Sequence, residues 1–561
     1  MMKKHTLIGC LLCLIFIQPA CSQQVGWEPS MDEYLEFRNE LGRFSGTVAI
    51  SRNDELVYLR STGTANRSWN IPVNDSTKYD IASVTKMFTA VGIAMLYEDG
   101  KIGLDDTILD HFSDFPISEI GAATTIRQLL SHTSGISDFF MQPGYLETDR
   151  YRLRELEDYD RFYNTVEVNE SQVGTMHYSN TNFMILGRII EKITGVDFYT
   201  YIREKVFDPL GMVNTGFYEH DLVVGNMAVG YTTDSQAVTE FGVPMDGRLR
   251  ANSYMRPARG MPAGGAYSTV ADLLRFMKAL RNESLLNSET FEEFTKEDGD
   301  GYALGFQSYT MDGIRFVGHS GGFYGVSSQI FYLPEKGYTV AILANNDFGA
   351  PPVFDRFISY LTGRKTYKAI SLDEEALSRF EGFYEIVHGE MNGKQLEIQV
   401  RDDHLLFDNE LEFYPYDRNS FFDIDNESFT LRFSEDSAGM IDGFQWTDGR
   451  NFTARAKTVA ENEMVELQKL EMNDTELETY LGDFEFGDSG MMPGHKPEIT
   501  IDDGTLLVDG RMRFVPFDVD KFYLQDDKQM QLHYIRNQAN EITGFHVKRG
   551  DSVLGEVSKL D

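Results

Sequence analysis

Apolar and polar residues alternate along residues 44–65, and the alternation is interrupted by the polar pair Asn53-Asp54. A period of two is typical of a strand with one face on a core, and Asn and Asp tolerate the backbone of a tight turn. The segment therefore predicts a β-hairpin. From Ile314 to Asn345 three further apolar runs are separated by turn residues, which predicts a meander of strands.

Helical patterns lie between these two strand regions. Residues 87–97 carry no charge, which predicts a helix buried on most sides, with Gly100 as its stop. Residues 181–193 repeat apolar positions at helical spacing and are followed by Gly195. Residues 269–280 predict another short helix.

The polar, Tyr-rich stretch of residues 138–165 has no clear period, and we expect a loop over a cleft there. Helices inserted between an early hairpin and late strands predict an α+β fold. In such a fold an antiparallel sheet is packed with helices.

An internal repeat follows residue 370. Three blocks recur in the same order at a nearly constant offset: Leu377–Tyr384 with Leu477–Phe484, Phe413–Asp417 with Phe514–Asp518, and Met440–Phe444 with Glu541–Phe545. Short alternating strands separate the blocks, so we expect two small all-β barrels or sandwiches. The predicted domains are a signal segment (1–21), an α+β domain (22–370) and two β repeats (371–460 and 461–561).

Composition limits the range of partners. The chain has 561 residues and a formal net charge of −37. A basic footprint is needed for nucleic-acid binding, so we expect no nucleic-acid partner. The acidic residues are spread along the chain, which we interpret as solvation. Whether the chain forms a homo-oligomer stays open.

The N-terminal residues resemble a bacterial secretory signal. Lys3 and Lys4 precede an apolar run over residues 7–17, and small residues follow up to Cys21. We therefore expect a periplasmic or membrane-anchored protein. Gln18-Pro19-Ala20-Cys21 is a loose lipobox, which leaves two alternatives, a lipid anchor on Cys21 or cleavage near Ser22. All three cysteines lie in this segment, so we expect no disulfide and no thiol nucleophile in the mature chain.

Ser83 and Lys86 form the chain's one Ser-x-x-Lys sequence, at the start of the apolar helix. Positions i and i+3 share a helix face, so the hydroxyl and the amine can meet. A lysine becomes a base when burial lowers its pKa, and a helix N-terminus favours negative charge nearby. The structural alternative is a capping serine followed by a surface lysine.

Two further motifs favour the catalytic interpretation of Ser83 and Lys86 over the structural one. Tyr178-Ser179-Asn180 precedes the helix at residue 181, and residues 319–322 (His-Ser-Gly-Gly) end one strand and turn into the next. Ser-x-x-Lys, Tyr-x-Asn and His-x-Gly in this order resemble the penicillin-recognising serine hydrolases, which include class C β-lactamases, D-alanyl-D-alanine peptidases, D-aminopeptidases and related esterases. The resemblance covers roughly residues 30 to 350. It implies a β-lactamase-like fold with a helical subdomain.

The resemblance also implies roles for these residues. It identifies as catalytic Ser83, Lys86, Tyr178 and His319, and as substrate-binding Asn180, Gly321 and Gly322. The serine would attack a carbonyl to form an acyl-enzyme, and either Lys86 or Tyr178 would be its formal base. Asn180 would orient an acyl side chain, and the backbone N–H groups of Ser83 and Gly322 would form an oxyanion hole.

The third motif departs from many β-lactamases, which have Lys-Thr-Gly where this chain has His319-Ser320-Gly321. Histidine is mostly neutral at pH 7 and supplies no fixed charge for a substrate carboxylate. We therefore expect a peptidase, amidase or esterase acting on D-amino-acid peptides or small amides and esters. The alternatives are β-lactamase activity and a non-catalytic sensor or binding module.

Two other patterns in the sequence have alternative interpretations. Residues 318–322 also fit the Gly-x-Ser-x-Gly elbow of α/β-hydrolases around Ser320, but strand-like residues follow where the elbow needs a helix. His132 with Asp138 could form a metal site or a second base, but we interpret them as a structural turn. No metal-binding motif is present, so we expect no metal and no cofactor.

Overall fold

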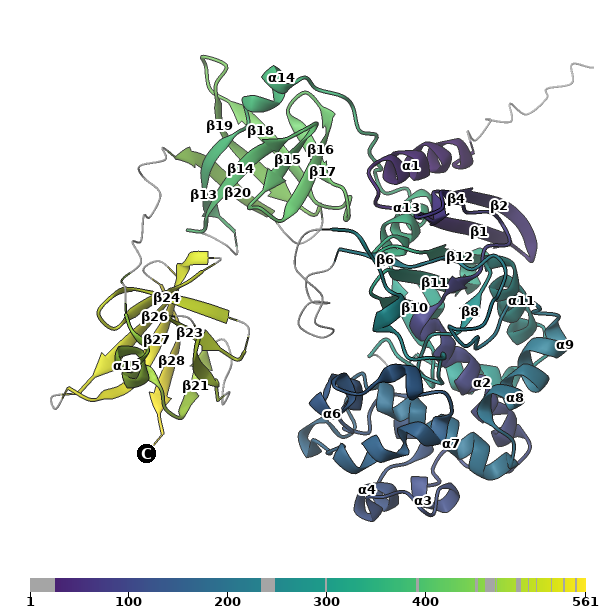
Figure 1. Cartoon of the computed structure of the whole chain (residues 1–561). Helices are drawn as coiled ribbons and strands as arrows, with labels where there is room; N and C mark the ends of the chain where they lie inside the picture. The colour runs from purple at the N-terminus through teal and green to yellow at the C-terminus, as the bar shows by residue number, and fades with distance from the viewer. Residues whose placement is uncertain are drawn as a thin grey trace, which may run out of the picture. The chain divides into compact units, whose positions relative to one another are not determined.

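The computed structural model (Figure 1) describes residues 26–233, 248–297, 300–389, 393–449, 453–459, 470, 472–490, 496–502, 504–510, 512–525, 527–537, 540–549 and 552–560. The chain divides into two compact units, Met1–Arg364 and Lys365–Asp561. The predicted signal segment and all three cysteines lie outside the described residues. No helix in the described part of the chain is long and apolar enough to cross a membrane.

A six-stranded antiparallel sheet is the frame of the first unit, in the order β2-β1-β12-β11-β10-β9. The strands are β1 (Gly46–Arg52), β2 (Glu55–Thr62), β9 (Gln307–Met311), β10 (Ile314–Phe323), β11 (Val326–Leu333) and β12 (Tyr338–Ala344). The predicted hairpin and the predicted meander are both confirmed. They form one sheet because β1 pairs with β12 over its whole length, from Gly46 opposite Ala344 to Arg52 opposite Tyr338.

Helices cover both faces of this sheet. On one face α1 (Glu28–Glu40) and α13 (Ala350–Thr362) pack on alternate strand residues such as Val48 and Ile342. On the other face the intervening residues Ala49, Ala341 and Leu343 join the core that contains α2 (Lys86–Glu98) and α11 (Val270–Arg281). Since neighbouring residues on a strand point to opposite faces, β1 and β12 are buried along almost their whole length.

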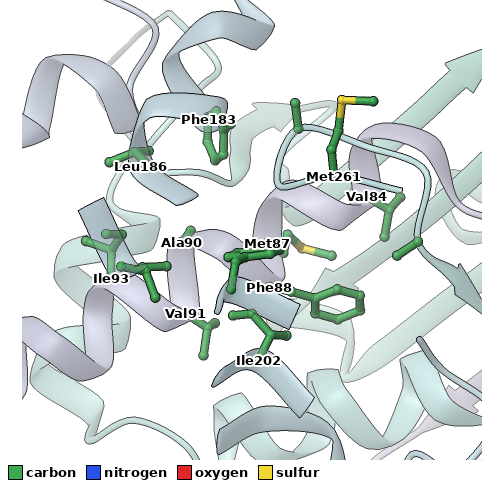
Figure 2. Close-up of a cluster of buried hydrophobic side chains, with 14 of the residues drawn as sticks. Val84, Met87, Phe88, Ala90, Val91, Ile93, Phe183, Leu186, Ile202 and Met261 are labelled. Atoms are coloured by element: carbon green, nitrogen blue, oxygen red, sulfur yellow. The ribbon is translucent and has the colours of Figure 1, made fainter. Parts of the chain in front are cut away.

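Helix α2 is buried on nearly all sides, as its uncharged sequence predicts. Figure 2 shows Met87, Phe88 and Val91 of α2 lying among side chains from α7 (Asn180–Thr194) and α8 (Phe198–Ile202). Helix α7 ends where expected, because Gly195 has a φ of 69° and supplies the left-handed cap. Helices α3, α4, α6 and α7 gather at one end of the unit, which forms the expected helical subdomain (Figure 1).

The prediction of a loop over residues 138–165 is wrong. The segment forms short helices, η2 (Phe139–Met141), α6 (Pro143–Leu146), η3 (Arg150–Arg152) and η4 (Leu156–Thr165). Its aromatic residues are buried against one another: Phe139, Tyr145, Tyr159, Phe162 and Tyr163. Three of the four tyrosines of this segment therefore belong to a local core, while Tyr151 is exposed.

The turn predicted at residues 319–322 is also displaced. Strand β10 runs through these residues to Phe323, and the hairpin turn falls at Tyr324-Gly325. Gly321 is needed because β10 lies close to the turn that carries Ser83. A Cβ on Gly321 would lie 2.3 Å from the carbonyl oxygen of Ile81 and 3.0 Å from the backbone nitrogen of Ser83. Strand β10 approaches the serine turn so closely that a side chain has no room there.

Smaller elements complete the first unit: β3 (Thr64–Asn66), β4 (Ile71–Pro72), β5 (Tyr79–Asp80), α3 (Ile108–His111), α4 (Ser118–Ala123), α5 (Ile126–Leu130), η5 (Glu170–Gln172), a π-helix (Arg203–Phe207), α9 (Asp208–Leu210), β6 (Tyr231–Thr232), β7 (Arg250–Ala251), η7 (Ser253–Met255), β8 (Tyr267–Ser268) and α12 (Ser288–Thr295).

The second unit contains the two predicted β modules. The first is a closed barrel of β13 (Gly382–His388), β14 (Gln395–Arg401), β15 (His404–Phe407), β16 (Leu411–Asp417), β17 (Ser420–Asp423), β18 (Thr430–Glu435), β19 (Ile441–Thr447) and β20 (Thr453–Val459). The second is an eight-stranded sheet of β21 (Phe484–Gly490), β22 (Ile499–Asp502), β23 (Thr505–Val508), β24 (Met512–Asp518), β25 (Lys521–Leu524), β26 (Asp527–Arg536), β27 (Ile542–Arg549) and β28 (Ser552–Lys559).

The internal repeat is visible in the detail of these modules. A short helix precedes each one, α14 (Glu374–Ser378) and α15 (Asp474–Leu477). The strand register shifts just after Pro415 in the first module and just after Pro516 in the second. Equivalent blocks of sequence therefore form equivalent structure.

Candidate active site

Ser83 lies in a 3-10 turn, η1 (Ala82–Thr85), that leads directly into α2. Ala82 has a φ of 41°, a left-handed conformation that is unfavourable for a residue with a Cβ. Its N–H donates to Asp80 Oδ1 at 2.6 Å, and its carbonyl oxygen accepts from Thr85 Oγ1 at 2.6 Å. Asp80 in turn forms a buried ion pair with Arg256. These bonds hold the strained residue that precedes the serine.

Lys86 has no exposed surface, and its amine contacts the serine hydroxyl. Nζ lies 3.1 Å from Ser83 Oγ, 2.7 Å from Asn180 Oδ1 and in hydrogen-bonding contact with the carbonyl oxygen of Ala263. Burial lowers the pKa of Lys86 to about 7, against the opposing attraction of Asp138. Near neutral pH much of the amine is therefore uncharged and can accept a proton from Ser83.

Tyr178 lies beside both groups. Lys86 Nζ is 4.8 Å from the centre of the phenol ring. Tyr178 is 40 % exposed as a residue, yet the protein around its hydroxyl desolvates the phenolate and raises the pKa of Tyr178, while a hydrogen bond with Ser83 opposes the rise. The phenol therefore keeps its proton at neutral pH and can donate it.

The ring of Tyr178 is held by two buried rings. The His132 ring lies 4.2 Å away and that of Tyr302 6.1 Å away, centre to centre. His132 Nδ1 accepts the N–H of Ser179 at 3.1 Å, and burial keeps the pKa of His132 well below its usual value. His132 is thus a neutral structural residue, as the sequence suggested. Among the residues that the structure describes, no group of three His, Cys, Asp or Glu side chains could hold a metal ion.

Asp138 belongs to the site, although the sequence analysis considered it only as a partner of His132. Its Oδ2 accepts the backbone N–H of Asn180 at 3.0 Å and the side-chain Nδ2 at 2.7 Å. These bonds turn the amide so that Oδ1 faces Lys86. No local motif predicts this link, because Asp138 is the N-terminal cap of the short helix η2 and Asn180 is the first residue of the distant helix α7.

His319 is buried behind the site, with 1 % of its surface exposed. Its Nδ1 donates to the carbonyl oxygen of Ser320, so Nε2 is the nitrogen that accepts from the Tyr302 hydroxyl, at 2.9 Å. Burial, and then the positive charge of Lys86, lower the pKa of His319 to about 3. The imidazole is therefore neutral, and both ring nitrogens are occupied.

The elbow interpretation of Ser320 fails on two observations. The chain continues as strand β10 after Ser320, whereas an elbow requires a helix. The hydroxyl of Ser320 donates to Gln307 Oε1 at 3.1 Å.

The edge of β10 passes beside Ser83. Phe323 and Val326 flank the hairpin turn, so Gly322 and Ser327 form a non-hydrogen-bonded pair, and the N–H of Gly322 points away from β11. Ser320, two residues earlier, points the same way and donates its N–H to Gln307 Oε1 at 3.0 Å. Strand β9 pairs with β10 only as far as Gly318. At Gly322 the edge is therefore available for a substrate carbonyl or an added strand.

A cavity of about 260 Å³ opens at this place. Ser83, Asn180 and Gly322 line it together with residues from the 138–146 and 253–265 segments. The structure thus brings all the predicted site residues to one location. Ser83, Asn180 and Gly322 border the cavity, while Lys86 and His319 lie buried behind them.

A hydroxyl beside a buried amine and a protonated phenol, at the edge of an antiparallel sheet, defines a serine hydrolase. The beta-lactamase family matches residues 31–361, and the chain belongs to that family.

Similar proteins agree with this assignment. Penicillin-binding protein 4* of Bacillus subtilis (strain 168) is 29% identical over 331 residues, which are 56% of this chain and 70% of that protein. The solved penicillin binding protein from Bacillus halodurans is 28% identical, with a TM-score of 0.51 over 58% of this chain and 98% of its own. The D-amino acid amidase from Ochrobactrum anthropi SV3, solved with L-phenylalanine amide, is 25% identical, with a TM-score of 0.52 over 60% of this chain and 99% of its own. The family expected from the sequence is confirmed.

Proposed function

We propose that this protein hydrolyses amides or esters through an acyl-enzyme on Ser83, and that D-amino-acid peptides and small amides or esters are its substrate class. The observation that carries the proposal is the contact between Lys86 Nζ and Ser83 Oγ, 3.1 Å apart, at a site where burial lowers the pKa of Lys86 to about 7. A base whose pKa lies near the working pH transfers protons efficiently.

In the first half-reaction, neutral Lys86 takes the proton of Ser83 while Oγ bonds to the substrate carbonyl carbon. The backbone N–H groups of Ser83 and Gly322 receive the negative charge on the carbonyl oxygen. The bond to the leaving nitrogen or oxygen then breaks, and Tyr178 gives its proton to that atom. The Lys86 ammonium then gives its proton to the Tyr178 phenolate, so both groups return to their initial protonation states while Ser83 Oγ carries the acyl group.

In the second half-reaction, a water molecule attacks the acyl carbon and loses its proton to Lys86. The ester bond to Ser83 breaks, the serine oxygen takes the proton from the Lys86 ammonium, and the acid leaves. Of the two bases that the sequence left open, this proposal assigns proton acceptance to Lys86, because burial favours its neutral form and favours the protonated form of Tyr178.

His319 acts in this proposal as a neutral positioning residue. It accepts the Tyr302 hydroxyl, and Tyr302 packs against the phenol of Tyr178. It supplies no positive charge for a substrate carboxylate, which favours amidase or esterase activity over β-lactam hydrolysis. The similarity to a D-amino acid amidase also supports amidase activity.

The test is active-site labelling together with turnover of p-nitrophenyl esters and D-amino-acid amides. A fluorophosphonate or penicillin-type probe should form an adduct on Ser83. Ser83→Ala should abolish labelling and turnover, whereas Ser320→Ala, which removes the other nearby serine hydroxyl, should keep both. An adduct on Ser320, or full turnover by Ser83→Ala, would refute the proposal.

We also propose an envelope location, supported by the signal-like residues 1–21 and by relatives named as penicillin-binding proteins. Cys21 would carry a lipid anchor, or the chain would be cleaved near Ser22. Mass spectrometry of the mature N-terminus tests this, because an unmodified chain that starts after Cys21 would exclude the anchor.

A further inference from the structure

The walls of the cavity beside Ser83 are largely apolar. Three segments supply them: Phe140, Tyr145, Leu146, Met255, Met261 and Phe323. The rings of Phe140 and Tyr145 meet edge to face, with centres 4.7 Å apart. Such an arrangement presents both ring faces and ring edges to a third aromatic group.

The first charged group in the lining is already neutralised. Arg256 and Asp80 are both buried and form an ion pair, and Arg256 Nη1 donates to the Tyr267 hydroxyl at 2.7 Å. Asp80 also accepts the N–H of Ala82. Neither residue can leave this network without exposing the other as a buried unpaired charge.

The other charged side chain of the lining, Arg259, is also paired. Arg259 lies over the Tyr199 ring at 3.4 Å, donates to the Phe217 carbonyl oxygen at 3.1 Å and pairs with Glu155 at 3.4 Å. Burial lowers the pKa of His220, so its imidazole is neutral, and both of its ring nitrogens are buried without a hydrogen-bond partner from any described residue. Among the described residues that line the cavity, none therefore offers an uncompensated charge to a ligand.

We propose that the cavity receives a large, apolar and uncharged acyl group, and that a free ammonium or carboxylate on this group is excluded. The inference rests on the proposed function and names the substrate class of the same site. A charge buried here would find no uncompensated opposite charge, and desolvation of a charge without such a partner is strongly unfavourable. Within the proposed substrate class, neutral acyl compounds, such as arylalkanoyl or N-blocked aromatic ones, are thus preferred over amino-acid amides with a free ammonium.

The size of the cavity agrees with one aromatic group. Its volume of about 260 Å³ lies just below the range of about 300 to 1,000 Å³ that is usual for whole-ligand sites. Asn180 and Gly322 border the same space as Ser83, so a group bonded to the reacting carbonyl enters it directly.

The test keeps the leaving group constant and varies the acyl group. Four p-nitrophenyl esters serve: acetate, 3-phenylpropanoate, and the latter with a para-aminomethyl or a para-carboxylate group. Each kcat/KM is divided by the rate of alkaline hydrolysis of the same ester. The phenylpropanoate should exceed acetate by about 10- to 100-fold, as burial of one phenyl group predicts. The corrected kcat/KM of each charged ester should be at least about tenfold lower than that of the unsubstituted phenylpropanoate.

Variants sharpen the result. Leu146→Glu places a carboxylate in the cavity wall and should raise kcat/KM for the ammonium ester to about tenfold above kcat/KM for the carboxylate ester. Val223→Glu, on a side chain that is fully exposed, is the control and should not change this ratio. Phe140→Ala should reduce the ratio of the phenylpropanoate kcat/KM to the acetate kcat/KM, both measured on the same variant. Circular dichroism reports whether each variant is folded.

Two failures are distinguishable. If Ser83→Ala abolishes turnover but the four esters react equally, or a charged ester is preferred, the cavity proposal is refuted and the proposed function stands. If Ser83→Ala hydrolyses all four esters as fast as the wild type, the proposed function itself is refuted.

Discussion

Asp138 accepts two hydrogen bonds from one residue, Asn180, whose backbone N–H and side-chain amide both reach Oδ2, at 3.0 Å and 2.7 Å. The amide is thereby oriented with Oδ1 toward Lys86, 2.7 Å from Nζ. Asp138 also raises the pKa of Lys86 by its charge. One carboxylate thus controls both the geometry and the proton affinity of the amine.

Asp138→Asn should consequently shift the acidic limb of the kcat/KM profile to lower pH, because removal of the negative charge lowers the pKa of Lys86 further. Activity near pH 7 should fall about tenfold as the amide loses its fixed orientation. Stopped-flow assays of an ester across pH 5 to 9 measure both effects. Glu170→Gln, an acidic residue outside this network, is the matched control. An unchanged profile in Asp138→Asn would contradict the assignment.

The wild-type pH dependence follows from Lys86. Its amine must be neutral to accept the serine proton, so kcat/KM should rise with pH through the pKa of Lys86, about 7. Tyr178 must be protonated, and burial raises its pKa, so the rate should fall only in strongly alkaline solution. Lys86→Arg should reduce kcat at least about 10³-fold, because arginine stays protonated. A rate that falls as pH rises through 7 would exclude Lys86 as the base.

The same amine should make folding stability depend on pH. The pKa of Lys86 is lowered from 10.5 to about 7 in the folded state, so between these values the unfolded chain binds one more proton than the folded chain. The free energy of unfolding should therefore rise with pH over this interval, by up to about 1.4 kcal/mol per pH unit relative to Lys86→Met. Urea unfolding of both proteins at pH 7, 8 and 9 measures the difference. Parallel pH dependences would show that Lys86 has its ordinary pKa.

Gly321 and Gly322 should differ sharply on substitution. Gly321→Ala places a Cβ 2.3 Å from the Ile81 carbonyl oxygen and 2.4 Å from Ser328 Oγ, so β10 must move away from the serine turn. We expect a loss of about 1–3 kcal/mol of stability and a large loss of activity. Gly322→Ala meets nothing within 4 Å and should keep the stability of the wild type. Thermal unfolding compares the two, and equal stabilities would contradict the close approach.

The buried pair Asp80–Arg256 should be needed for stability. Asp80→Asn leaves the Arg256 guanidinium buried without a charged partner and should destabilise the protein by about 3–5 kcal/mol. The double variant Asp80→Asn/Arg256→Met removes the uncompensated charge and should recover most of that loss. A full double-mutant cycle by chemical denaturation measures the coupling. Additive effects would show that the pair does not interact.

Local sequence patterns predicted the elements that carry the chemistry. Ser83 and Lys86 could be paired because a spacing of three residues puts them on one helical face, and the uncharged run after them could only be a buried helix. The cap at Gly195 was readable for the same reason, since glycine is the usual residue at a left-handed helix end.

The errors arose where one residue type serves two purposes or where distant segments meet. Glycines at 321 and 322 suggested a turn, but strand β10 runs through both, and Gly321 is needed for the close approach of β10 to Ser83. The Tyr-rich stretch of residues 138–165 has no clear period and predicted a loop, but Tyr145, Tyr159 and Tyr163 are buried in a local core. The bond from Asp138 to Asn180 and the pairing of β1 with β12 depend on tertiary structure, which no local period encodes.

The pairing of β1 with β12 also has a consequence for biosynthesis. Strand β1 leaves the ribosome early, but the partner that completes its hydrogen bonds is made only when residues 338–344 are translated. Contacts so far apart in sequence slow folding, and a nascent fragment that stops before β12 would expose the unpaired edge of β1 to aggregation. The sheet of the hydrolase unit therefore cannot be completed until translation has passed Ala344.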